Sequence, residues 1–292
     1  MKKKFKIFCF GFGQVAEYFI KKLIEDNFEF EIVTTNTKQT QIKKFNQINF
    51  KSYYFCGKQF DPNLIDELIH SNKVLISIPP RGSNDLVLQS FNKIFKRIKF
   101  DWITYLSATS VYGDKGGKRV DENIKPNPTS IRGISRLNAE REWLKYFKEY
   151  NLPIQIFRLS GIYSNENNIL KRLKAGTLKI AEINNHFFSR IHIEDIASVL
   201  SISLTKFNPG QIFNISDNYP SSNTEIAKYA SGLIKMQIPK SIAVDEIESE
   251  MLRDFYRDSK KISNEKMKSF FKYNLKYPTF KEGLKIIRNH IV

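Results

Sequence analysis

Two glycines and an alanine near the amino end have the spacing of a phosphate-binding turn. The stretch FCFGFGQVAEYF places Gly11-x-Gly13-x-x-Ala16 between an apolar run and an amphipathic segment. The first glycine permits a tight turn, the second lets the backbone approach a diphosphate, and the small Ala16 lets a helix pack closely on a strand. A helix that starts here, with Gln14 and Val15 in its first turn, offers free N–H groups and a partial positive charge to phosphates. The pattern predicts a dinucleotide-binding site.

The end of the second predicted strand bears on which dinucleotide is bound. Sites for NAD usually place Asp or Glu there, to hold the 2′-hydroxyl of the adenosine ribose. Here the residues are VTTNTKQ, without a carboxylate, and Asn36 and Lys38 could receive a 2′-phosphate instead. NADP is therefore favoured over NAD, although a solvated loop lysine is the competing interpretation of Lys38. Ser77 and Pro79, which end the fourth predicted strand, complete the expected cofactor site.

A pair of arginines forms a second candidate site. In TSIRGISRLNAERE, residues 129–142, Arg132 and Arg136 stand four residues apart, so a helix places them on one face. A general acid or base works best with a pKa near the working pH, whereas a guanidinium, with a pKa of about 12.5 or above, stays charged. A guanidinium can instead anchor a carboxylate or phosphate through two parallel hydrogen bonds. This face is predicted to bind and orient anions and not to transfer protons.

Short β-rich runs alternate with helical periodicity around these residues. Strands are expected at 5–11, 28–35, 48–55, 73–78, 102–107 and 153–160, and helices at 14–26, from Asp61, at 84–98 and up to about 149. Several strands are continuous apolar runs, which is typical of parallel strands buried on both faces. The alternation predicts an α/β fold with a Rossmann-type doubly wound parallel sheet.

The alternation loosens after residue 160, which indicates a change of organisation. A helix near 193–206, a strand at 211–216, a helix at about 222–236 and a basic helical tail follow. A nucleotide-binding Rossmann domain is expected over 1–165. Residues 166–292 are expected to form a smaller, partly interleaved C-terminal substrate lobe, with about 187–220 returning to the Rossmann body.

The composition of the chain bears on which classes of binding partner are expected. The chain has 292 residues, 41% of them hydrophobic, and a net charge of +17, but its lysines are spread along its length and form no local basic patch. No apolar run reaches the roughly 18 residues of a membrane span, and MKKKFKIFCFGFG reads as a first strand and not as a signal peptide. A cytoplasmic protein is expected, without nucleic-acid or membrane partners, whose charge attracts small anions. Cys9 and Cys56 are expected to be small buried hydrophobes, and the scattered histidines predict no metal site.

A series of motifs resembles a known family. FGQVA, ISIPPRGSND, YLSATSVYGD, RLNAEREW, FRLSGIYS, RIHIEDIA and IFNISDNYP occur in the order seen in extended short-chain dehydrogenases/reductases, the NAD-dependent epimerase/dehydratase group. The resemblance covers roughly residues 5 to 220 and is nearest to the atypical branch with Pro-Pro after the fourth strand. It implies a nicotinamide cofactor and a small polar substrate, with a homodimer as the assembly considered.

The chain departs from that family at the residues that carry the chemistry. Standard members use a Ser or Thr, a Tyr and a Lys four residues after the Tyr. Aligned on VYG and RLNAE, the Tyr position falls on Arg132, the Lys position on Arg136 and the hydroxyl position on Ala108, between Ser107 and Thr109. The Tyr-x-x-x-Lys pair is therefore absent, and the proton needed for hydride transfer must come from another group. The alignment implies that Arg132 anchors a substrate carboxylate or phosphate and that Arg136 donates to ribose hydroxyls in place of the lysine.

With the resemblance in hand, other residues can be considered as replacements for the missing catalytic pair and as the lining of a substrate cleft. Tyr112 and Tyr163, just past strand ends, are the candidate proton donors, with Thr109 positioning the substrate; a structural role is the alternative for Tyr112. Arg190 would contact an anionic group of the substrate, His192 is either substrate-binding or structural, and Asp195 is expected to cap a helix. Basic residues of a short helix are expected at the cleft mouth: Lys171, Arg172 and Lys174.

Two classes of function follow from these residues. The first is an NAD(P)-dependent oxidoreductase, epimerase or dehydratase with a non-standard catalytic site, acting on a small polar substrate such as a phosphorylated or nucleotide-linked sugar. The second is a non-catalytic NADP(H)-binding sensor or regulatory protein that kept the cofactor pocket and lost turnover. The absent triad supports the second, whereas the cleft-lining segments from 158 to 195 support the first.

Overall fold

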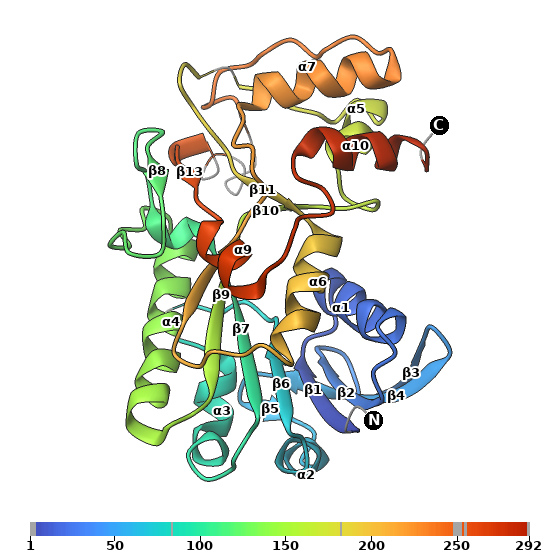
Figure 1. Cartoon of the computed structure of the whole chain (residues 1–292), viewed down its shortest axis with the longest axis vertical. Helices are drawn as coiled ribbons and strands as arrows, with labels where there is room; N and C mark the ends of the chain where they lie inside the picture. The colour runs from blue at the N-terminus through green and yellow to red at the C-terminus, as the bar shows by residue number, and fades with distance from the viewer. Residues whose placement is uncertain (1–3, 83, 182, 248–252, 254–255, 291–292) are drawn as a thin grey trace. The chain divides into compact units, whose positions relative to one another are not determined.

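The structure is a computed structural model that describes residues 4–82, 84–181, 183–247, 253 and 256–290. By its internal contacts the chain divides into two compact units, coloured by residue number in Figure 1. Unit 1 comprises Met1–Ala108, Ile134–Arg158 and Ile196–Phe213, and unit 2 comprises Thr109–Gly133, Leu159–Asp195 and Asn214–Val292. The two units are therefore interleaved in sequence.

Among the described residues, nine strands form one sheet in the order β12-β9-β7-β6-β1-β2-β4-β3, with β5 paired to β4. Strand β1 pairs parallel with β2 on one side and with β6 on the other, and β6 pairs parallel with β7. The order reverses at β1, as expected for a doubly wound sheet, and this expectation is confirmed. The strands are β1 (Phe5–Phe10), β2 (Phe30–Asn36), β3 (Gln41–Phe45), β4 (Ile48–Cys56), β5 (Gln59–Phe60), β6 (Lys73–Ile76), β7 (Trp102–Ala108), β9 (Ile154–Leu159) and β12 (Ile212–Ile215).

Helices cover both faces of the sheet in unit 1 (Figure 1). Helices α2 (Asn63–Ile69), α3 (Leu86–Phe95) and α4 (Ile131–Tyr150) bury apolar side chains in one core with the strands. On the other face, α1 (Gln14–Glu25) and α6 (Ile193–Ser203) are joined by a hydrogen bond from Ser201 Oγ to Asp26, 2.6 Å long. The apolar stripes of the sequence explain this layering, because each helix can bury only one face.

The connection from β2 to β4 departs from the usual α/β pattern. These strands pair parallel, and parallel neighbours are usually joined by a helical crossover. Here β3 and β4 instead form an antiparallel hairpin, with Lys43 opposite Phe50. Strand β3 was not expected, because QIKKF carries lysines in place of the apolar residues typical of a buried strand. Strand β3 is the edge of the sheet, where charged residues are common.

Unit 2 is built from short strands and helices. Strand β10 (Gly161–Tyr163) pairs with β11 (Arg190–His192), and β8 (Arg119–Val120) pairs with β13 (Lys261–Ile262), both in parallel. The 3₁₀-helix η1 (Thr109–Tyr112) and α9 (Glu265–Phe271) also belong to it. Its apolar core joins α5 (Ile169–Lys174), α7 (Asn223–Ile234) and α10 (Phe280–Arg288), with Leu170, Ala230, Phe280 and Leu284 almost fully buried.

The unit boundaries fall at other residues than those of the expected domains. Residues 109–133 and 159–165, expected in the nucleotide-binding domain, belong to unit 2. Of the segment 187–220, expected to return to the Rossmann body, residues 196–213 lie in unit 1, whereas 187–195 and 214–220 lie in unit 2. In the described part of the chain, no helix combines the length and the apolar character needed to cross a bilayer. No cluster of metal-ligating side chains is found there either.

Candidate functional site

The turn after β1 has the geometry that a diphosphate requires. Gly11 has φ +86°, and a Cβ there would lie 2.7 Å from Ile78 Cγ2. Its backbone N–H donates to Thr35 Oγ1 at 2.8 Å, which ties the turn to β2. Gly13 is the N-cap of α1 and provides no side-chain cap, and Ala16 is fully buried against the sheet. The amino end of α1, which begins at Gln14, therefore has the backbone arrangement and partial positive charge that suit an anion.

A cavity of about 290 Å³ opens beside this turn, at the carboxyl ends of the central strands. Ligands of doubly wound sheets bind at this position, where the strand order reverses. The lining combines the turn, the end of β2, the hairpin strand β3 and the loop after β6: Gly11, Phe12, Gly13, Thr35, Asn36, Thr37, Lys43, Phe55, Cys56, Ile78, Pro79, Arg81 and Leu86. Cys56, expected to be a buried hydrophobe, is partly exposed here, whereas Cys9 is buried as expected.

Three of the predicted cofactor residues, Asn36, Lys38 and Ser77, differ in how they relate to this cavity. The amide nitrogen of Asn36 donates to Gln39 O and Ser52 O, and its amide oxygen accepts from the backbone N–H of Lys38 and Gln39. Asn36 lines the cavity while it holds the β2–β3 turn, and Lys38 is absent from the lining. Ser77 Oγ donates to Phe10 O and so braces β6 against β1.

The two arginines of α4 have different surroundings. Arg136 Nη1 donates to the carbonyl of Leu106 at 2.7 Å, which directs its guanidinium at the end of β7 in unit 1. Arg132 is exposed in the first turn of α4 and falls in unit 2. Arg136 thereby uses one of its donors on the protein's own backbone. Its charge also lowers the pKa of the buried Asp85, against the larger effect of burial, which raises it.

Tyr112, one of the two candidate proton donors, is enclosed in unit 2. It lies in η1 with no exposed surface, and its phenol donates to Asn214 Oδ1 at 2.8 Å. Thr109 begins the same 3₁₀-helix and is partly buried. A phenol that is buried and bonded to a side-chain amide is placed as a packing group, which favours the structural interpretation of Tyr112.

Replacing Tyr112 by phenylalanine is therefore expected to act on stability. Loss of the bond to Asn214 should cost about 1–3 kcal/mol of unfolding free energy, because a buried amide oxygen loses its donor. Urea unfolding of the variant and the parent measures this difference. If the variant unfolded like the parent yet lost at least 100-fold in any turnover found, the phenol would belong to the chemistry and not to the packing.

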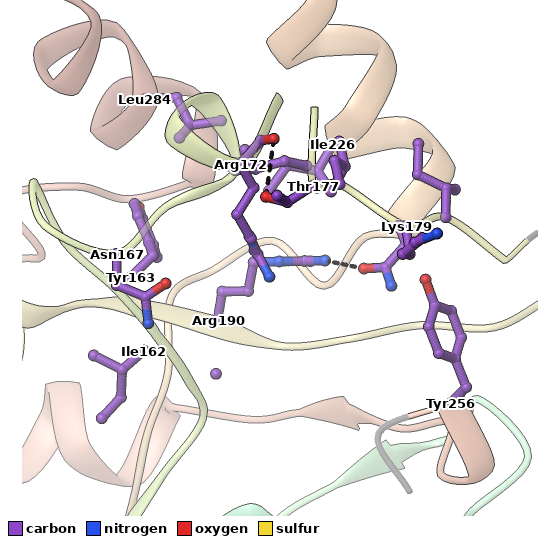
Figure 2. Close-up of a pocket in the computed structure, with 15 residues that line it drawn as sticks. Ile162, Tyr163, Asn167, Arg172, Thr177, Lys179, Arg190, Ile226, Tyr256 and Leu284 are labelled. Carbon is purple, nitrogen blue, oxygen red and sulfur yellow. Dashed lines mark hydrogen bonds between the residues drawn. The ribbon is translucent and has the colours of Figure 1, made fainter. Parts of the chain in front are cut away.

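A larger cavity of about 490 Å³ lies within unit 2. Three cationic side chains line it, Arg172, Lys179 and Arg190, together with the rings of Tyr163 and Tyr256 (Figure 2). Ile162, Ile169, Leu178, Ile180, Ile226 and Leu284 form its apolar wall. Among the described residues, no carboxylate lines this cavity. Such a lining suits a ligand with both an anionic and a flat apolar part.

Arg190 is fixed in place by the protein. Its Nη1 donates to Ser221 Oγ at 2.9 Å and to Phe188 O, and its Nη2 donates to Asn223 Oδ1 at 2.7 Å. Burial lowers its pKa to about 10, so the group remains charged at neutral pH. Arg172 reaches the same region from α5 (Figure 2), and its charge further lowers the pKa of Arg190. Arg190 thus contributes a fixed charge, while Arg172 is the more exposed guanidinium.

Tyr163 and His192 lie side by side, but only Tyr163 lines the cavity. Their rings are 5.1 Å apart, and Tyr277 covers the other side of His192 at 4.0 Å. Within the described residues, the phenol oxygen of Tyr163 has no hydrogen-bond partner. Burial and the nearby Asp217 carboxylate raise its pKa, so the phenol stays protonated. His192 is 1% exposed and accepts the backbone N–H of Glu194 on Nδ1, a placement that favours its structural interpretation.

Asp195, expected at a helix cap, accepts hydrogen bonds from the Lys276 backbone N–H and the Tyr273 phenol.

The buried His192 predicts a loss of stability in mild acid. Burial lowers its pKa to about 4, against about 6.5 in the unfolded chain. Since the unfolded state binds the proton first, the unfolding free energy should fall by about 1 kcal/mol from pH 7.5 to 5.5 through this group. Denaturation of the parent and of His192→Phe at both pH values measures it. The variant should show a shallower pH dependence, and an unchanged dependence would refute this assignment.

Several lining residues were not anticipated from the sequence. Lys43 and Arg81 in the first cavity, and Lys179, Asn223 and Tyr256 in the second, were not among the candidates. The alternation of QIKKF would have placed Lys43 and Phe45 on one strand face, had β3 been expected. For Lys179, Asn223 and Tyr256 the sequence offers no signal, because segments far apart in the chain bring them together.

The chain is similar in sequence and in fold to known proteins. Residues 89–216 match the model of the NAD dependent epimerase/dehydratase family. The dTDP-D-glucose 4,6-dehydratase of Homo sapiens is 23% identical over 256 residues, which cover 77% of this chain and 72% of that protein. A functionally unknown conserved protein from Silicibacter pomeroyi superposes with a TM-score of 0.84 at 29% identity, over 98% of this chain and 99% of its own.

A further solved structure shares the fold. UDP-glucuronic acid 4-epimerase from Bacillus cereus, in complex with UDP-glucuronic acid and NAD, superposes with a TM-score of 0.77 at 18% identity, over 98% of both chains. The resemblance inferred from the ordered motifs is confirmed by the family match over residues 89–216. The chain is thus similar to the NAD-dependent epimerase/dehydratase family over residues 89–216, and to a dTDP-D-glucose 4,6-dehydratase over a longer part of its length.

Proposed function

We propose that the chain is an NAD(P)-dependent oxidoreductase of the epimerase/dehydratase type whose substrate is a small anionic, nucleotide-linked sugar. The observation that carries this proposal is the lining of the unit 2 cavity, with three cations, two tyrosine rings and an apolar wall. A nucleoside diphosphate offers a flat base to the rings and two phosphates to the guanidinium groups. Sugar nucleotides are bound by relatives such as the UDP-glucuronic acid 4-epimerase, which supports the same class here.

The dinucleotide is assigned to the turn Gly11–Ala16. It would be held at the amino end of α1, and when bound it would supply the hydride acceptor or donor for the substrate. The residues around it position the two ribose–phosphate halves, as Thr35 does by fixing the backbone of Gly11. NADP(H) is preferred in this proposal, since no carboxylate stands at the end of β2.

The chemistry would proceed without the Tyr-x-x-x-Lys pair. Of the two phenols, Tyr163 is the better candidate to donate a hydrogen bond or proton to substrate, because it lines the cavity and Tyr112 does not. Arg132 and Thr109 remain proposed substrate contacts. The second candidate function, a non-catalytic NADP(H)-binding sensor, is favoured by Arg132 at the tyrosine position and by the bond from Arg136 to the Leu106 carbonyl.

One experiment separates the two functions. Purified protein is incubated with NADPH or NADP⁺ and a panel of UDP- and dTDP-linked hexoses and hexuronic acids, and both nicotinamide absorbance and sugar products are followed. Turnover of any member, including epimerisation without net redox change, supports the enzyme. Tight nucleotide binding with no product across the panel supports the sensor. Absence of nucleotide binding would contradict both.

Within this proposal, Arg172→Ala should weaken binding of the nucleotide sugar about 10–100-fold, because a charge-assisted bond to phosphate contributes about 1.5–3 kcal/mol. The matched control is Lys171→Ala, which removes the same charge from the same helix at a position outside the cavity lining. Calorimetric titration with UDP-glucuronic acid or dTDP-glucose measures both. Equal losses in the two variants would show general electrostatic attraction and not a specific contact.

A further inference from the structure

We propose that Lys43 and Arg81 form a subsite for a phosphate monoester on the adenosine ribose, through which the cofactor cavity of unit 1 selects NADP(H) over NAD(H). This inference rests on the proposed function, in that it needs a dinucleotide on the turn Gly11–Ala16. It assigns the recognition of the 2′-phosphate to residues other than Asn36 and Lys38.

The end of β2 lies where the adenosine ribose is expected. Thr35, Asn36 and Thr37 line the cavity next to Gly11 and Gly13, and an NAD site would carry its ribose-binding carboxylate on this strand end. A carboxylate there accepts bonds from ribose hydroxyls and repels a 2′-phosphate. Among the described residues that line this cavity, none is acidic, and two are cationic, Lys43 and Arg81. The charge of the lining therefore suits a dianion.

Strand β3 directs Lys43 into the cavity. Side chains of a strand alternate between its faces, so Gln41, Lys43 and Phe45 share one face and Ile42 and Lys44 share the other. The first three are partly buried and the last two exposed. Phe45 packs on Phe12 of the glycine turn, with ring centroids 5.5 Å apart, which shows that this face looks toward the diphosphate site.

Arg81 approaches from the loop after β6. Its backbone and that of Asn84 exchange hydrogen bonds of 3.2 and 3.3 Å, and Gly82 has φ +60°. Its Nη1 lies 3.6 Å from the thiol of Cys56, at the end of β4. A thiol is a weak acceptor, and this contact leaves most of the five guanidinium donors for a phosphate. The planar fork can then bind two phosphate oxygens at once.

The residues assigned from the sequence are engaged elsewhere. The Asn36 amide is committed to the β2–β3 turn by bonds to Ser52 and Gln39, so its rotation toward a ligand would break that turn. Lys38 is exposed to solvent and does not line the cavity. The hairpin that replaces a crossover helix thus brings a different lysine, seven positions after Asn36, to the ribose.

The test compares 2′-phospho-ADP-ribose with ADP-ribose by calorimetric titration at constant salt. The parent should prefer the phosphorylated ligand at least about 10–100-fold, since each charge-assisted contact is worth about 1.5–3 kcal/mol. Lys43→Gln and Arg81→Gln should each remove about 10-fold or more of that preference and leave the affinity for ADP-ribose within about 2-fold. Lys44→Gln, on the opposite face of the same strand, and Lys38→Gln should retain the preference.

The outcomes are distinguishable from failure of the proposed function. If the parent binds neither ligand, the dinucleotide site itself is wrong. If it binds both equally, or if Lys43→Gln and Lys44→Gln lower the preference alike, the cofactor site stands and the phosphate subsite is refuted. A preference that is lost in Lys38→Gln and kept in Lys43→Gln would return the role to the residue assigned from the sequence.

Discussion

Glu140→Ala is expected to destabilise the fold by about 3–5 kcal/mol, among the largest effects of any single substitution in unit 1. The Glu140 and Arg158 side chains are 1% and 3% exposed and form a bidentate pair. Arg158 Nε donates to Oε1 at 3.0 Å and Nη2 donates to Oε2 at 2.6 Å. Removal of the carboxylate leaves a guanidinium buried without its counter-charge, which costs far more than the pair itself contributes. Urea or thermal unfolding measures the change.

Two comparison variants make this prediction specific. Glu149→Ala removes the same side chain from the same helix, but its pair with Lys145 is exposed and 3.7 Å long, so a change below about 0.5 kcal/mol is expected. The double variant Glu140→Leu with Arg158→Leu removes both charges and should be more stable than Glu140→Ala. Destabilisation of Glu140→Ala no larger than that of Glu149→Ala would show that the pair is not buried as described.

Gly13→Ala is expected to abolish most dinucleotide binding while the fold is kept. The position has φ −95° and ψ −174°, which alanine adopts freely, and a Cβ there meets no protein atom within 4 Å. The unfolding free energy should therefore change by less than about 1 kcal/mol. The methyl group would stand where the diphosphate approaches the N–H groups of α1, so the affinity for NADP(H) or NAD(H) should fall roughly 100-fold.

Substitution of Gly11, the other glycine of the turn, is expected to have a different effect from substitution of Gly13. Gly11→Ala places a Cβ 2.7 Å from Ile78 and 2.9 Å from Ser77 Oγ at a positive φ, so it should lower both stability and affinity. Thermal unfolding and nucleotide titration of both variants separate the two effects. Unchanged affinity in Gly13→Ala would place the diphosphate away from this turn, and the assignment of the cofactor site would fall with it.

The sequence predicted the parts of the fold that depend on local patterns. The apolar runs of β1, β6 and β7 identified the buried strands, and the glycine spacing identified the turn at Gly11. Strand β3 was missed because an edge strand needs no apolar face on both sides, so its lysines resembled a loop. The helix expected from Asp61 begins at Asn63, whose backbone N–H bonds to the Asp61 carboxylate.

The candidate site was harder to predict, because many of the hydrogen-bond partners of its side chains are distant in sequence. The Tyr112 phenol donates a hydrogen bond to Asn214, 102 positions away, and no local sequence pattern predicts that partner. Asn36 resembles a ligand residue in sequence, yet its amide nitrogen donates to Ser52 across the sheet and its amide oxygen accepts from the Gln39 backbone in the following turn. Arg190 was expected to line a substrate pocket and does line the unit 2 cavity, where Ser221 and Asn223 hold its guanidinium.

The placement of β3 at the border of the sheet has a consequence for local unfolding. A strand with a single hydrogen-bonded neighbour separates from its sheet at a lower free-energy cost than a central strand does. The cofactor cavity therefore has one firm wall, β1 with its turn, and one wall that loosens readily. A nucleotide that bridges both would slow amide hydrogen exchange most in the hairpin, and much less in strands already protected by neighbours on each side.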